Sequence, residues 1–239
     1  MKLEGRNAVA EALNAGRNID KILAQNSADV KNLTREAVKM GIKVQYVDKR
    51  VLDEQSVTKK HQGIIAFASD YKYSTVEDIV NYAKAKKEDL LVLILDGVED
   101  PHNLGSILRV AECAGAHGVI IPKNRAVPVN ETAVKVSAGA SERVKVAKVT
   151  NLNSTITKLK KNGVFVYSAD MDGEVMYKTN LKGNIAIVVG GEGTGVSALT
   201  RKNSDAIISI PMFGKINSLN ASVSAGIVLY EAVRQRIKG

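Results

Sequence analysis

Residues 185–195 read IAIVVGGEGTG, and this stretch decides the fold of the second half of the chain. A run of apolar residues that ends at a loop of small residues predicts a buried strand of a parallel sheet. Glycines in the loop leave the backbone uncovered, so a ligand can approach it closely. Glu192 stands among residues that are too small to shield it. We therefore expect a ligand site where this strand ends.

A second apolar strand, Leu90 to Leu95, also ends in a polar loop. The loop leads into a helix that either Asp100 or Asn103 can cap, because both side chains accept hydrogen bonds from free backbone amides. Arg109 lies six residues beyond Asn103. An arginine that is buried there would need an anionic partner such as a phosphate, whereas a surface arginine would need none.

A third strand, Ala206 to Ile210, runs into Pro211 and Met212, and Asn220 can cap a long C-terminal helix. One face of that helix carries an apolar stripe made of Leu219, Val223, Ile227, Tyr230, Val233 and Ile237. Such a stripe predicts a surface that packs into the core, with a subunit interface as the alternative.

From residue 90 onward, strands alternate with helices. This alternation predicts an α/β fold whose mostly parallel sheet has helices on both faces and ligand sites beyond the carboxyl ends of the strands. Further strands are expected at 119–121, 144–149 and 164–168, and helices at 104–114, 130–140, 152–162 and 219–237.

The first 70 residues form a separate, smaller α/β pattern. Helices are expected at 7–13 and 27–40, the second ended by Gly41, and strands at 21–24, 42–47 and 63–68. Residues 71–89 are rich in Lys, Glu and Asp and predict a solvated linker helix. We therefore expect an N-terminal domain over 1–70, a linker over 71–89 and a second domain over 90–239.

The composition favours a polyanionic partner. The chain has 239 residues and a formal net charge of +9, which suits the phosphates of a nucleic acid, although solubility alone could explain it. Cys113 is the only cysteine, and we expect a buried, inert thiol. The three histidines lack metal-ligand spacing, so no metal site is expected. No apolar run reaches the roughly 18 residues of a membrane span, so we expect a cytoplasmic protein.

The glycine loop approaches two nucleotide-binding motifs without satisfying either. Residues 190–197 have the spacing of a P-loop, but Val196 stands where that motif requires a lysine to hold phosphates. Val196 also takes the place of the last glycine of G-x-G-x-x-G after Gly191 and Gly193. The pattern therefore disfavours an NTPase, and a dinucleotide-binding oxidoreductase is an alternative that cofactor titration would test.

Taken in order, residues 96–109, 187–195 and 208–226 resemble the three motifs of the SpoU, or TrmH-like, RNA ribose 2′-O-methyltransferases of the SPOUT superfamily. The resemblance is carried by Asn-Leu-Gly-Ser-Ile-Leu-Arg, Gly-Gly-Glu-Gly-Thr-Gly, Ile-Pro-Met and Ser-Leu-Asn-Ala-Ser. Near the N-terminus, Gly-Arg-Asn-Ala-Val and His-Gln-Gly-Ile resemble a ribosomal-protein-like RNA-binding domain. That domain occurs in the branch that methylates a guanosine ribose in 23S rRNA.

The resemblance implies a homodimeric enzyme that uses S-adenosylmethionine and whose catalytic domain carries a C-terminal trefoil knot. Matched position by position, the cofactor site comprises Gly190, Gly191, Gly193, Ile210, Met212 and Leu219. The catalytic or substrate-positioning residues are Asn103, Arg109, Glu192, Ser218 and Asn220. The counterpart of Arg109 has been proposed as a base in the family. Because a guanidinium keeps its proton, our hypothesis is that Arg109 holds a substrate phosphate or stabilises developing negative charge.

The substrate class is RNA, and rRNA is favoured because of the additional N-terminal domain. Arg6, Lys59 and Lys60 are the candidate phosphate contacts in that domain, with a solvated basic surface as the alternative. Two other functions remain open, namely a tRNA 2′-O-methyltransferase and a non-catalytic RNA-binding or ribosome-assembly protein of the same fold. The complete set of motif residues favours the enzyme.

Overall fold

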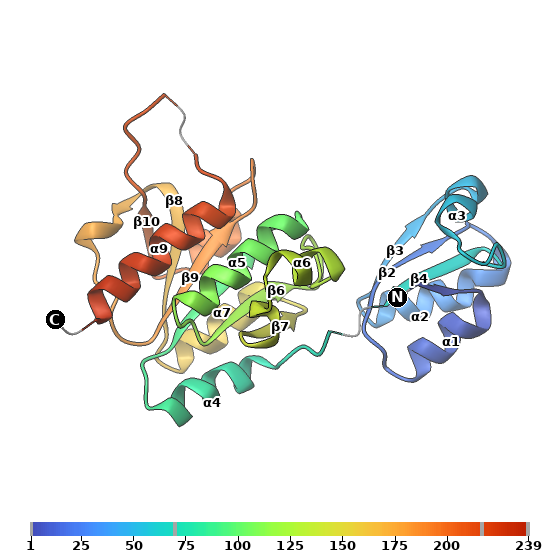
Figure 1. The fold of residues 1–239 in the computed structure, drawn as a ribbon, viewed down its shortest axis with the longest axis horizontal. Helices are drawn as coiled ribbons and strands as arrows, with labels where there is room; N and C mark the ends of the chain where they lie inside the picture. The colour runs from blue at the N-terminus through green and yellow to red at the C-terminus, as the bar shows by residue number, and fades with distance from the viewer. Residues whose placement is uncertain (1, 69–70, 216–217, 238–239) are drawn as a thin grey trace. The chain divides into compact units, whose positions relative to one another are not determined.

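The computed structural model describes residues 2–68, 71–215 and 218–237, which divide into two compact units between Lys72 and Tyr73 (Figure 1). Each unit has its own sheet and its own buried apolar core.

The N-terminal unit is built on a four-stranded sheet in the order β1-β4-β2-β3. The strands are β1 (Lys2–Glu4), β2 (Ile19–Ala24), β3 (Lys43–Tyr46) and β4 (Ile64–Ala68), and only β2 and β3 pair in parallel. The helices are α1 (Arg6–Asn14), α2 (Lys31–Lys39) and α3 (Lys49–Gln55). Alternate residues of β4 face opposite sides, so Ile64 packs in the cluster that contains α1 and α2, and Ile65 packs against Leu52 of α3.

The second unit holds a six-stranded sheet in the order β10-β8-β9-β5-β6-β7, and all its strand pairings are parallel in the described residues. The strands are β5 (Leu91–Asp96), β6 (Gly118–Pro122), β7 (Lys145–Val149), β8 (Phe165–Val175), β9 (Ile185–Gly190) and β10 (Ala206–Ser209). The α/β fold with a parallel sheet is therefore confirmed. β5 and β9 lie side by side at its centre, where strands covered on both faces must be apolar throughout.

Helices cover both faces of this sheet (Figure 1). On one face, α4 (Val76–Lys86) and α7 (Leu152–Lys161) pack against Val92, Ile94 and Val188. On the other face, α5 (Pro101–Cys113) and α9 (Ala221–Arg236) lie side by side. Two shorter helices, α6 (Glu131–Val136) and α8 (Ala198–Asn203), complete the unit.

Residues 71–89 do not form the solvated linker helix that the sequence predicts. The helix exists as α4, but Ile79 and Ala83 are buried in the core of the second unit. These two residues are four positions apart and therefore lie on one face, although lysines and acidic residues dominate the composition. Thr75 caps α4, because its hydroxyl accepts a hydrogen bond from the Asp78 amide at 3.1 Å.

The C-terminal stripe is not core, which corrects the first interpretation of the sequence. Val223, Tyr230 and Ile237 are 48%, 49% and 67% exposed. The buried residues of α9 are instead Ala221, Ala225, Val228, Leu229, Ala232 and Glu231, which is paired with Arg234. Small residues let α9 approach the sheet and α5 closely. Because the polar residues of α9 are spread around the helix and do not gather on one side, periodicity alone could not say which face is buried.

Two smaller predictions differ from the structure. Cys113 is exposed at the end of α5, so the prediction of a buried thiol is wrong. The predicted helix over 27–40 is a short 3-10 turn, Ala28–Val30, followed by α2, and Gly41 has the left-handed φ of 74° expected after it. No helix in the described parts of the chain is both long and apolar enough to cross a bilayer.

Candidate active site

Three side chains from distant parts of the sequence meet at the carboxyl end of the parallel sheet. The Asn103 amide donates a hydrogen bond to Glu192 Oε1 at 3.1 Å. The Asn220 amide donates to Asn103 Oδ1 at 2.8 Å and to the same Glu192 oxygen at 2.5 Å. We call Asn103, Glu192 and Asn220 the amide–carboxylate cluster. All three are candidate catalytic residues from the sequence.

The orientation of Asn220 follows from its role as the cap of α9. Its Oδ1 accepts hydrogen bonds from the backbone amides of Ser222 and Val223 at 2.9 and 3.3 Å, as the sequence predicts for a cap. The side-chain nitrogen must therefore face the cluster. Asp100 caps α5 by accepting from the His102 amide at 3.0 Å, which leaves Asn103 available to bind Glu192.

Glu192 is held at one oxygen and open at the other. Oε1 accepts both amide hydrogen bonds, whereas Oε2 accepts none from the residues that the structure describes. The residue is exposed, while Asn103 is only 6% exposed. The buried Asn103 amide and the helix-capping Asn220 amide hold one carboxylate oxygen of Glu192. The cluster thus presents the other oxygen to a molecule that enters the site.

Asp96 fastens the glycine loop, and the sequence interpretation gave it no role. Its carboxylate accepts a hydrogen bond from the Ser197 amide at 3.0 Å, and its carbonyl accepts from the Gly191 amide at 2.9 Å. The side chain is 5% exposed. An acidic residue that directly ends a fully apolar strand was the signal that could have identified it.

The glycines are required because the loop folds tightly onto neighbouring backbone. A Cβ on Gly190 would lie 2.1 Å from the Gly195 carbonyl carbon, and a Cβ on Gly191 would lie 1.9 Å from the carbonyl oxygen of Gly97. Gly193 differs, since its φ of 76° favours glycine but the space around it is open.

A cavity of about 420 Å³ opens beside the cluster, within the usual size range of small-molecule sites. Its lining is Asp96, Gly97, Val98, Glu99, Asp100, Asn103, Arg125, Glu192, Thr194, Gly195, Ser197 and Ala221. Four carboxylates face one guanidinium there, so the cavity favours a positively charged ligand. Arg125 was not predicted, and nothing local in the sequence marks it.

The structure does not bring all the predicted residues together. Arg109 and Ser218 are exposed and make no hydrogen bond to the cluster among the described residues. Six residues on a helix turn through about 240°, so Arg109 lies on a different side of α5 from Asn103. None of the six predicted cofactor residues is among those that line the cavity: Gly190, Gly191, Gly193, Ile210, Met212 and Leu219. No group of metal-binding side chains occurs within the described ranges.

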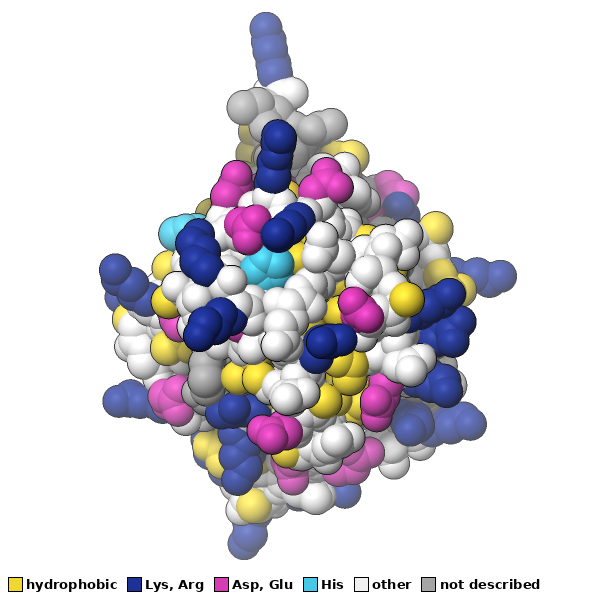
Figure 2. All heavy atoms as spheres, turned by 90° about the vertical axis from the view of Figure 1, so that its right-hand side faces the viewer, with side chains coloured by type: hydrophobic (Ala, Val, Ile, Leu, Met, Phe, Trp, Pro, Cys, Tyr) yellow, Lys and Arg dark blue, Asp and Glu magenta, His cyan; other side chains and the backbone are white. Residues whose placement is uncertain are grey.

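The three basic candidates in the N-terminal unit differ in their contacts. Lys59 donates from its ammonium to the Asp53 carbonyl at 2.6 Å, and Arg6 lies 3.8 Å from the Asp29 carboxylate. Lys60 is exposed and makes no ion pair within the part of the chain that the structure describes. Figure 2 shows Lys and Arg side chains projecting from this side of the molecule, with acidic side chains between them.

Two family models match the chain, one for each unit. Residues 90–230 match the SpoU rRNA methylase family, and residues 2–74 match the domain described as RNA 2′-O ribose methyltransferase substrate binding. A TrmH family tRNA/rRNA methyltransferase of Bacillus subtilis (strain 168) is 43% identical over 97% of this chain and 94% of its own length. A Staphylococcus aureus (strain COL) protein of the same name is 44% identical over 97% and 95%.

Solved structures share the fold over nearly the whole chain. The SpoU methyltransferase AviRb from Streptomyces viridochromogenes, in complex with AdoMet, superposes with a TM-score of 0.64 at 24% identity, covering 100% of this chain and 91% of that one. A structure described as an RNA 2′-O ribose methyltransferase gives 0.57 at 26% identity, covering 99% and 88%. The chain belongs to the SpoU rRNA methylase family.

Proposed function

We propose that this protein transfers a methyl group from S-adenosylmethionine to a ribose 2′-hydroxyl of RNA, specifically a guanosine of 23S rRNA, in the cytoplasm. The observation that carries the proposal is the amide–carboxylate cluster. Its members come from all three motifs and converge beside the glycine loop, in a chain that also matches the family's substrate-binding model. A methyl transfer to oxygen requires the hydroxyl to be aligned and its proton accepted, which the cluster can support.

The residues of the site fit S-adenosylmethionine. When bound, the cofactor supplies an electrophilic methyl group on a positively charged sulfonium, and the acidic cavity favours such a charge. We propose that the backbone of Gly190, Gly191 and Gly193 holds it, since other residues of the same loop, Glu192, Thr194 and Gly195, line this cavity. Ile210, Met212 and Leu219 would supply apolar contacts from the neighbouring loop.

The chain's own groups position the substrate. We propose that the open Glu192 oxygen accepts a hydrogen bond from the ribose, held in place by Asn103 and Asn220, and that alignment supplies much of the rate gain. Arg109 binds a substrate phosphate and Ser218 contacts the substrate from the opposite loop. An Arg109→Lys variant tests this role of the arginine, because lysine keeps the positive charge but lacks the planar, forked set of guanidinium donors. Near-full turnover would argue against a need for guanidinium geometry.

We also propose that the protein is a homodimer joined through the exposed stripe of α9. Val223 and Tyr230 are about half exposed, Ile237 is 67% exposed, and the exposed side of the adjacent α5 carries Arg109. A dimer there would cover apolar surface and bring Arg109 to the interface. Tyr230→Arg should shift the protein to monomers in analytical ultracentrifugation, and an unchanged mass would contradict this interface.

Two further features follow from the family assignment. We propose that the chain after β10 is knotted, with α9 threaded back toward β9 and α5, and that the N-terminal unit is a ribosomal-protein-like RNA-binding domain. In support, α9 packs on β9 and α5 although β10 lies at the edge of the sheet.

The first experiment is to incubate the protein with methyl-labelled S-adenosylmethionine and total RNA from a strain that lacks its gene. Label on a ribose of 23S rRNA is the expected result. Label on tRNA would preserve the chemistry and overturn the substrate. Cofactor binding without label on any RNA would favour the non-catalytic protein of the same fold, and a repeat with ribosome assembly intermediates would complete that test.

A further inference from the structure

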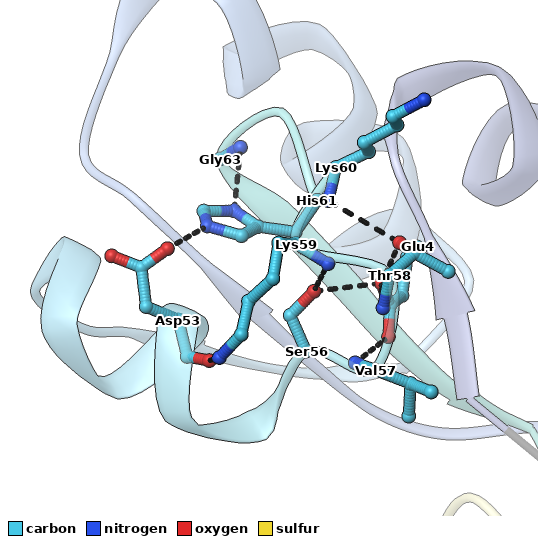
Figure 3. A network of polar contacts seen from close by, with 9 residues as sticks. All are labelled: Glu4, Asp53, Ser56, Val57, Thr58, Lys59, Lys60, His61 and Gly63. Carbon is cyan, nitrogen blue, oxygen red and sulfur yellow. Dashed lines mark hydrogen bonds and ion pairs between the residues drawn. The ribbon is translucent and has the colours of Figure 1, made fainter.

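In the N-terminal unit, a single carboxylate holds one loop at several points (Figure 3). Glu4, at the end of β1, accepts hydrogen bonds from the Ser56 hydroxyl at 2.8 Å, the Val57 amide at 2.6 Å and the Thr58 amide at 3.1 Å. The Thr58 hydroxyl donates to it as well. These hydrogen bonds lower the pKa of Glu4 to about 2, so the carboxylate is ionised under physiological conditions.

The same hydroxyls extend the restraint along the loop to two lysines. The Ser56 hydroxyl accepts from the Lys59 amide at 2.8 Å, and the Thr58 hydroxyl accepts from the Lys60 amide at 3.3 Å. Lys59 has a left-handed φ of 61°, a conformation that side chains other than glycine adopt only under restraint. The backbone from 56 to 60 is therefore fixed by contacts that begin at Glu4.

On its other side, the loop is anchored through Asp53 and a buried histidine. His61 Nδ1 accepts from the Gly63 amide at 3.1 Å, so Nε2 carries the proton that is shared with the Asp53 carboxylate at 3.0 Å. The Lys59 ammonium donates to the Asp53 carbonyl. In Figure 3 the Lys60 side chain points away from this network. Lys59 thus serves the loop, while Lys60 is available.

Arg6 lies on the segment next to Lys60. The Arg6 amide donates to the side-chain oxygen of Gln62 at 3.1 Å, and a Cβ on Gly5 would lie 3.4 Å from the Lys60 carbonyl oxygen. The φ of Gly5 is 92°, so this close approach depends on glycine. Two exposed cationic side chains therefore begin from neighbouring backbone segments, both of which adjoin β1. Arg6 lies 3.8 Å from the exposed Asp29 carboxylate, and a phosphate would have to replace that carboxylate.

We propose that Glu4 is a positioning residue for RNA, because it holds the loop over 56–60 so that Lys60 and Arg6 together bind the RNA backbone. This inference rests on the proposed function for the class of ligand. It assigns phosphate binding to Lys60 and Arg6 and removes Lys59 from that role. A glutamate is needed because every group that faces it is a donor. The amide of a glutamine would present a donor to some of them.

The test is a double-mutant cycle on RNA binding by the full-length protein, with labelled 23S rRNA from the strain that lacks the gene. We expect Lys60→Ala to weaken binding about 10-fold and to reduce the slope of log K against log salt by roughly 0.7 to 0.9. Glu4→Gln should weaken RNA binding about 3- to 10-fold and should also reduce the slope of log K against log salt relative to the wild type. Lys60→Ala should cost less in the Glu4→Gln background than in the wild type.

Two controls separate positioning from general stability. Lys39→Ala removes an exposed lysine from α2 and should change binding less than 2-fold, and Lys59→Ala should act only through the loop and leave the salt slope unchanged. The proposal would be overturned if Glu4→Gln lowered the melting temperature but left the RNA affinity and the salt slope unchanged. It would also be overturned if the fold-changes in RNA affinity from Glu4→Gln and Lys60→Ala simply multiplied in the double variant. Methyl transfer is measured separately, so binding that follows the expected pattern without any methylation would contradict only the proposed function.

Discussion

Two loops in this molecule are each anchored by one acidic residue, and we propose different ligands for them. In the second unit, Asp96 is 5% exposed, its backbone carbonyl accepts a hydrogen bond from the Gly191 amide, and its carboxylate accepts one from the Ser197 amide. In the N-terminal unit, Glu4 is half-buried and holds a loop that carries lysines. In our proposals, the glycine loop offers its backbone to a small ligand at close range, whereas the lysine loop offers long side chains to a large one. Similar anchoring would then serve two different kinds of binding.

The largest expected effect tests the glycine loop. Gly191→Ala places a Cβ 1.9 Å from the Gly97 carbonyl oxygen, where backbone must move, so we expect loss of measurable cofactor binding in calorimetry. Gly193→Ala is the matched control. It meets open space and costs only the left-handed strain of roughly 1–2 kcal/mol, with cofactor binding retained. Equal loss of cofactor binding in both variants would show that cofactor binding depends on the flexibility of the glycine loop rather than on its close packing against Gly97.

Next in size is the effect of the open carboxylate oxygen in the second unit. Glu192→Gln keeps the shape but places an amide among the Asn103 and Asn220 donors, so we expect kcat to fall roughly 100-fold. The cofactor affinity and melting temperature should change little, because the residue is exposed. Turnover within 2-fold of the wild type would remove Glu192 from the reaction and leave only its loop contacts.

The two anchors can be compared directly by truncation. Asp96→Ala leaves the half-buried Ser197 amide without its acceptor and should lower the free energy of unfolding by roughly 1–3 kcal/mol. Glu4→Ala should lower it by less, since water can reach the freed donors of a half-buried loop. Urea denaturation of both variants measures the difference. A larger loss at Glu4 would mean that the N-terminal loop, not the glycine loop, depends more on its anchor.

The smallest expected effect is a pH dependence confined to the N-terminal unit. The pKa of Glu4 is lowered from 4.5 to about 2 in the folded protein, so its stabilisation is present above about pH 4.5 and is lost as the pH falls toward 2. Relative to wild type, Glu4→Gln should therefore lose less stability on acidification in that range. Parallel curves of melting temperature against pH for the two proteins would contradict the role of this carboxylate as an ionised anchor.

Parts of the fold could be predicted because the signal is local. β5 and β9 are unbroken apolar runs, as strands with helices on both faces must be, and Asn220 caps α9. The prediction failed for α9 and α4. In α9 the polar residues are spread around the helix, so its buried face depends on the elements packed against it. In α4, Ile79 and Ala83 form the buried face, but charged residues dominate the composition and conceal that pattern.

The sequence by itself determined the strands of the parallel sheet, the cap of α9 and the order of the three polar loops, because these depend on residues only a few positions apart. Only the tertiary structure decided that Asn103, Glu192 and Asn220 touch, across separations of 89 and 117 residues along the chain. It also decided that Asp96 anchors the glycine loop and that the Lys59 ammonium binds the Asp53 carbonyl, whereas the Lys60 ammonium has no such contact among the described residues. The physical reason is the pairing of β5 with β9, strands that are neighbours in space but not in sequence. No local preference encodes that pairing, which arises from the burial of the whole sheet.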